Sequence, residues 1–168
     1  MSQPVPPPGN PFAQGAAQPD GAVPPAPFGD PPAPVRDNIG LGLVAALVAA
    51  LVAAGVYGGI AGAIEREIGW VAIGVGFLVG FAAGKVGGPS PLLPVAGAVL
   101  SLGAVYLGQL VGIAVIIAKE LNVSATDIFF NNFGLLNEAW GESKDLMTFV
   151  FFAFAAFASF AGAKKAAE

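Results

Sequence analysis

The 168-residue sequence contains no cysteine and no histidine. Without cysteine there is no disulfide, no thiolate nucleophile and no cysteine-bound iron–sulfur cluster. Without histidine there is no imidazole base, no histidine-bound haem and no ordinary zinc site. The sequence therefore offers no catalytic, cofactor-binding or metal-binding residues, and because no nucleophile–base pair is visible we expect a protein that is not an enzyme.

Charge is also scarce. Only 11% of the residues are charged, against about 25% in a typical soluble domain. The mean hydropathy is +0.74. Lysine and arginine form no cluster larger than a pair, so the basic footprint of a nucleic-acid-binding protein is missing. The charged residues lie mainly at the ends of long uncharged segments. A helix needs about 20 predominantly apolar residues to cross a bilayer.

Four segments satisfy that length. Their approximate bounds are 39–64, 68–85, 92–118 and 146–163. Leucine, isoleucine, phenylalanine and valine are frequent in them, and each favours insertion by about 0.3–0.6 kcal/mol. The sequence therefore predicts an all-α integral membrane bundle of four transmembrane helices within residues 35–168, with the lipid bilayer as its surroundings.

Residues 1–34 have a different composition. They hold all but three of the 15 prolines, together with many glycines, alanines and glutamines. Such a segment cannot bury enough apolar surface to fold, and it samples extended polyproline II. We expect a disordered cytoplasmic tail that is either a passive spacer or, through its spaced prolines, a docking segment for a cytoplasmic protein.

The segment before the last span is amphipathic. At 100° per residue, Phe129, Phe133, Leu136 and Trp140 fall on one stripe, and most of the acidic and amide residues gather opposite. This pattern predicts an interfacial helix at about 125–141 whose apolar side chains anchor it in the membrane surface. The alternative is an ordinary loop helix packed on the bundle.

An even number of spans puts both termini on one side of the membrane. Four basic residues lie on that side and three on the other, so the positive-inside rule favours cytoplasmic termini. Trp70 and Trp140 both fall at the opposite interface, where tryptophan serves as an aromatic anchor.

Glycines recur at intervals of four in three of the predicted spans. They are Gly55 with Gly59, Gly58 with Gly62, the series Gly76, Gly80 and Gly84, and Gly108 with Gly112. Glycine lets another helix backbone approach closely. These helix-packing residues serve either contacts within one bundle or the assembly of a homo-oligomer.

Polar side chains within the predicted spans are few. Gln109 is the strongest hydrogen-bonding group, and Tyr106 lies about one turn before it. The pair either forms an interhelical hydrogen bond or lines a pore. No acidic or basic residue lies deep in a span, although ion pathways and coupled transport usually need one.

The segment 68–80, with the sequence IGWVAIGVGFLVG, resembles a segment of small multi-pass bacterial membrane proteins of uncharacterised function. The proline-rich start, residues 1–12, resembles the tails of many actinobacterial membrane proteins. These resemblances imply a bacterial cell (inner) membrane setting and no particular activity.

Together these observations predict a non-enzymatic membrane scaffold or accessory subunit that associates through glycine-lined helix faces. The alternative is a small oligomeric channel or transporter with Tyr106 and Gln109 near the path.

Overall fold

The computed structural model describes residues 37–66 and 68–168, and this part of the chain is helical with no strand. Four helices are long and apolar enough to cross a membrane: α1 (Ile39–Ile64), α2 (Gly69–Gly87), α3 (Leu92–Leu121) and α6 (Leu146–Ala167). The all-α prediction of four membrane-spanning helices is therefore confirmed, and the chain is a multi-pass membrane protein. The predicted tail, residues 1–34, lies outside the described residues.

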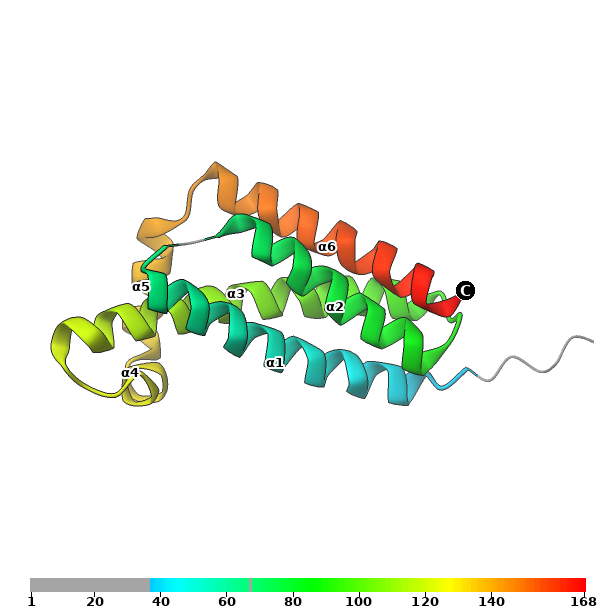
Figure 1. The fold of residues 1–168 in the computed structure, drawn as a ribbon, viewed down its shortest axis with the longest axis horizontal. Helices are drawn as coiled ribbons and strands as arrows, with labels where there is room; N and C mark the ends of the chain where they lie inside the picture. Colours follow the sequence, from blue (N-terminus) through cyan, green and yellow to red (C-terminus); the bar gives the residue numbers. More distant parts are fainter. Residues whose placement is uncertain (1–36, 67) are drawn as a thin grey trace, which may run out of the picture. The chain divides into compact units, whose positions relative to one another are not determined.

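The four long helices run side by side and alternate in direction (Figure 1). Two short helices, α4 (Ala125–Asn131) and α5 (Phe133–Ser143), lie at the end where α1 ends and α2 begins. We call this the α4–α5 end. At the opposite end, the backbone N–H of Asn38 donates to the carbonyl of Gly87 at 3.0 Å, which joins the start of α1 to the end of α2.

The interior is filled mainly by small side chains. Where α1 meets the rest of the bundle it buries alanines, among them Ala46, Ala50 and Ala54. Small residues let membrane helices approach closely, so dispersion contacts accumulate although lipid is as apolar as the protein. A second cluster, near the α4–α5 end, includes Leu110 of α3 and Leu136 of α5, both without exposed surface.

The helices extend beyond the apolar segments that predicted them. We expected ends near residues 85, 118 and 163, but α2, α3 and α6 continue to Gly87, Leu121 and Ala167. The reason is physical: the first charged residue marks where a segment meets polar surroundings, whereas the helix ends only when its backbone leaves the helical conformation.

The prediction of one continuous surface helix at 125–141 is wrong in its continuity. The structure has two helices with a break at Asn132, whose backbone (φ −126°, ψ 36°) is not helical. Both helices pack on α3, through Ile128 and Leu136, which are 6% and 0% exposed. The break lets each short helix turn its own apolar side toward α3.

Candidate functional site

The glycine series of α2 faces α6 inside the bundle. Each glycine of the series lies against the backbone of one residue of α6. An added Cβ atom would overlap a carbonyl group in each of three pairs: Gly76 with Ala155, Gly80 with Ser159, and Gly84 with Ala163. The partners on α6 are also four residues apart, so the two helices meet along matching rows of small residues. This close approach leaves no room for any side chain on that face of α2.

Glycines of α1 and α3 form a second close contact. A Cβ atom on Gly58 or Gly62 would collide with Val111 or Val115 of α3, and one on Gly108 would collide with the ring of Tyr57. Gly112 is less tight, since its nearest neighbour would be the Cβ atom of Ala61 at 3.4 Å.

Gly55 and Gly59 behave differently. Neither has an atom within 4 Å of an added Cβ, and both are exposed on the outer side of α1. Their neighbours Val52 and Val56 are 62% and 57% exposed. Of the nine glycines singled out from the sequence, this pair alone faces outward.

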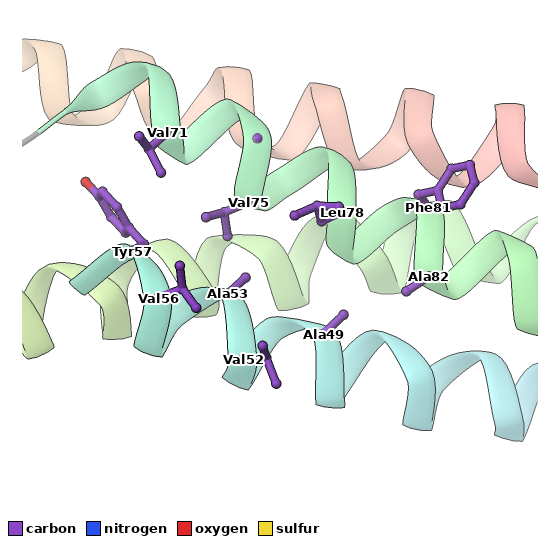
Figure 2. Close-up of a pocket in the computed structure, with 11 residues that line it drawn as sticks. Ala49, Val52, Ala53, Val56, Tyr57, Val71, Val75, Leu78, Phe81 and Ala82 are labelled. Atoms are coloured by element: carbon purple, nitrogen blue, oxygen red, sulfur yellow. The ribbon is translucent and has the colours of Figure 1, made fainter. Parts of the chain in front are cut away.

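A groove between α1 and α2 adjoins this outer face (Figure 2). It has a volume of about 480 Å³, and Val52 and Val56 line it together with Val75 and Leu78 of α2. Figure 2 shows Tyr57 at one end of the groove, with its hydroxyl group directed away from the apolar side chains. The groove is apolar, so it suits a lipid chain or an apolar side chain of a partner.

The two polar residues predicted in the third span contact α5. Gln109 is 6% exposed, and its Oε1 accepts a hydrogen bond from Trp140 Nε1 at 2.7 Å. Tyr106 donates its hydroxyl to Asn137 Oδ1 at 2.6 Å and meets the Trp140 ring edge-on, with ring centroids 5.0 Å apart. These bonds fix α5 against α3, a partner that the sequence did not indicate.

The predicted membrane anchors occupy unlike surroundings. Leu136 is fully buried, so it belongs to the protein interior rather than to the membrane surface, and Trp140 is half-buried against α3. Phe129 is also half-buried, whereas Phe133 is 43% exposed. Trp70, at the start of α2, is 74% exposed, and its role as an interfacial anchor stays a prediction.

Lys119 closes the end of α1. Its ammonium group donates to the carbonyls of Gly62 and Ala63 at 2.9 and 3.2 Å and lies 3.5 Å from the carboxylate of Glu65. The last carbonyls of a helix lack partners within the helix and carry partial negative charge, so a lysine from α3 both satisfies and neutralises them.

Two recesses enter the bundle at the α4–α5 end, and Tyr57 and Gln109 line both. The first has a volume of about 190 Å³ and includes Glu65 and Arg66. The second, which we call the α6-side recess, has a volume of about 230 Å³. Its other lining residues include Gly69, Asp145, Thr148 and Phe151.

The recesses lie at one end of the length that the four long helices share. Tyr57 and Gln109 are level with the starts of α2 and α6, because all four helices line the α6-side recess. From Ile39 to Tyr57 the rise is about 27 Å, close to the thickness of about 30 Å of a hydrocarbon core. Gln109 therefore belongs to the end of the shared span and not to its middle.

Asp145 begins α6 with a capping box that the sequence analysis missed. Its Oδ1 accepts from the backbone N–H of Thr148 at 2.8 Å and from the Thr148 hydroxyl at 3.0 Å, and its own N–H donates to that hydroxyl at 3.3 Å. The backbone hydrogen bond from Thr148 is the main reason that the pKa of Asp145 lies below its ordinary value of 3.8. Asp145 followed three residues later by Thr148 was the available signal.

This cap predicts an acid-sensitive start of α6. Because the pKa of Asp145 is lower in the folded than in the unfolded chain, its stabilisation is complete above pH 3.8 and is lost as the pH falls through the lowered value. We expect Asp145→Asn, which caps without a charge, to lose less stability than the parent on acidification. Thermal unfolding in detergent between neutral pH and about pH 3 measures this; equal losses in both proteins would contradict it.

Comparison of the chain with protein-family models, with curated proteins and with solved structures finds no significant match.

Proposed function

We propose that the protein is a non-enzymatic membrane scaffold or accessory subunit that associates through the outer face of α1. The observation that supports this is the division of the glycines. Among the glycines spaced four residues apart, those on α2 and α3, and Gly58 with Gly62 on α1, meet neighbours within the chain, whereas Gly55 and Gly59 have no atom within 4 Å of an added Cβ. Outward glycines four residues apart therefore mark a place where a further helix fits.

The side chains beside these glycines suit such a contact. Val56 follows Gly55 and Ile60 follows Gly59, and both are exposed. β-branched side chains have few rotamers to lose, and glycine lets the partner backbone approach closely. α1 also contributes the least to the bundle interior. In its most apolar 18-residue stretch 22% of the residues are buried, against 28–44% in the corresponding stretches of the other spans. Its outer face is therefore available to a second copy or another membrane subunit.

The setting that we propose is the bacterial cell (inner) membrane with both termini cytoplasmic. At the α4–α5 end, the described residues include six acidic and three basic side chains; at the opposite end, they include three lysines and two acids. With Arg36, which precedes α1 in the sequence, the side of the termini has four basic residues against three on the other, and the positive-inside rule then favours cytoplasmic termini. Residues 1–34 would then reach a cytoplasmic partner.

Self-association of the purified protein tests the proposal. We expect Gly59→Leu to weaken association about tenfold or more, because the added side chain separates the helix backbones by more than a close contact allows. Sedimentation equilibrium in detergent, and chemical crosslinking in liposomes, measure the association. If the partner is another subunit, co-purification from membranes replaces self-association as the readout.

Gly103→Leu is the matched control. Gly103 is an exposed glycine of α3 that also has no atom within 4 Å of an added Cβ, so leucine there adds the same bulk away from the α1 face. Equal effects of the two substitutions, or a parent protein that neither self-associates nor co-purifies with a partner, would contradict the proposal. Ion or solute flux through liposomes carrying the parent protein would favour the channel or transporter alternative.

A further inference from the structure

The α6-side recess is lined by one carboxylate oxygen and one amide nitrogen for which no hydrogen bond is found within residues 37–66 and 68–168. The hydrogen bonds from Thr148 both reach Oδ1 of Asp145, and Oδ2 makes none to the described residues. The only hydrogen bond of Gln109 to that part of the chain uses Oε1, so its amide nitrogen remains without an acceptor there. Among the described residues the buried side-chain polar atom without a partner is Ser159 Oγ and not the Gln109 nitrogen, so this nitrogen is accessible from the recess and can donate to an acceptor of a ligand there.

Aromatic rings complete the lining. Phe151 lies so close to Gly69 that any side chain at position 69 would overlap its ring, and the Trp70 ring meets the Phe151 ring edge-on with centroids 6.0 Å apart. Tyr57 supplies a second ring. Aromatic faces attract ammonium groups, most strongly where water is partly excluded.

Charge and size restrict the ligand further. The described residues of the α4–α5 end carry twice as many acidic as basic side chains, which raises the local concentration of cations and repels anions. The volume of about 230 Å³ is below the range of about 300–1,000 Å³ that is typical of pockets for drug-sized molecules. A small group carrying positive charge fits both conditions.

We propose that the α6-side recess binds a primary ammonium compound that carries an oxygen acceptor, of which ethanolamine is the simplest example. Asp145 binds the ammonium group, Phe151 and Tyr57 flank it, and the amide nitrogen of Gln109 donates to the oxygen. The same ethanolamine unit occurs free in water and as a phospholipid headgroup, and the recess lies at the level where a headgroup would meet the bundle. This binding is separate from association through α1, which lies on another surface.

Tryptophan fluorescence of the full chain in detergent tests the proposal. The sequence has two tryptophans; Trp140 is hydrogen-bonded to Gln109, and Trp70 contacts Phe151. We expect the fluorescence to change saturably with ethanolamine. Propylammonium, which lacks the oxygen, should bind more weakly, and propionate, which lacks the ammonium group, should leave the fluorescence unchanged. No saturable change with ethanolamine, or equal changes with all three compounds, would overturn the proposal without recourse to any variant.

Asp145→Asn removes the negative charge and keeps the helix cap, because asparagine caps a helix about as well as aspartate. We expect it to bind ethanolamine about tenfold more weakly, the effect of losing a close ionic contact. Asp127→Asn is the matched control: it removes the same charge at the same end, on α4, and does not line the recess. Unchanged affinity in Asp145→Asn, or an equal loss in Asp127→Asn, would overturn the role of Asp145.

Nanodiscs distinguish the two sources of the ligand. If the headgroup is the natural ligand, nanodiscs containing phosphatidylethanolamine abolish the response to free ethanolamine that phosphatidylcholine nanodiscs retain. If a free compound is the ligand, the response is the same in both. A response in neither kind of nanodisc would show that the recess binds ethanolamine only when detergent replaces the bilayer, which overturns the proposal.

Discussion

Gly80→Ala is expected to destabilise the bundle by about 1–3 kcal/mol, or more if the helices cannot separate locally. The added methyl group would overlap the carbonyl group of Ser159, and because that atom belongs to the α6 backbone it cannot turn aside as a flexible side chain would. α2 and α6 must move apart, and the neighbouring close contacts at Gly76 and Gly84 are lost with them. Thermal unfolding in detergent, followed by circular dichroism, measures the change.

Gly74→Ala is the control on the same helix. Gly74 is exposed and has no atom within 4 Å of an added Cβ, so alanine there has room and favours the helix by up to about 1 kcal/mol over glycine. We therefore expect opposite signs for two identical substitutions only six residues apart in the chain. A Gly80→Ala protein as stable as the parent would mean that the row on α2 does not face α6.

Trp140→Phe has the second large expected effect. It removes the donor to Gln109 Oε1 and leaves a nearly buried amide oxygen without its partner, which costs about 1–3 kcal/mol. The loss is local, because α5 contacts the bundle mainly through α3. Faster hydrogen exchange or proteolysis within residues 133–143, with little change in the four long helices, is the expected result.

A double-mutant cycle isolates the hydrogen bond. Gln109→Met removes the other partner, and the double variant with Trp140→Phe should be less destabilised than the sum of the two, since neither polar group then remains unpaired. Tyr106→Phe is the control, because its bond to Asn137 is exposed and its loss should cost about 0.5–1.5 kcal/mol. Additive effects of the first pair would exclude the hydrogen bond as the cause.

The four spans were predictable because insertion depends on composition over about 20 residues, and composition is a property of the sequence. The surface helix was harder. The periodicity identified an apolar stripe but assumed one unbroken helix, and a break at Asn132 changes which side chains face α3. Leu136 is therefore a core residue, and the exposed Phe130 (75%) was not singled out.

For the candidate sites, the sequence indicated which residues matter but not which way they face or which residues they contact. The spacing of Gly55 with Gly59 is the same as that of Gly58 with Gly62, and no feature of the sequence distinguishes the outward pair from the inward one. Facing directions depend on how each helix is rotated about its axis, and that rotation is fixed by the neighbouring helices. The partnership of Gln109 with Trp140 and the capping box at Asp145 likewise join features that apolar periodicity does not reveal.

The sequence alone indicated that this chain spans a membrane four times as helices, because uncharged apolar segments of that length favour hydrocarbon over water and a backbone there must satisfy its own hydrogen bonds. The tertiary structure decided which glycines are used inside the bundle, which pair is left on its surface, and which polar groups meet at one end. Those outcomes depend on contacts between residues far apart in the chain, since packing of small side chains, and not hydrophobicity, orders helices within lipid.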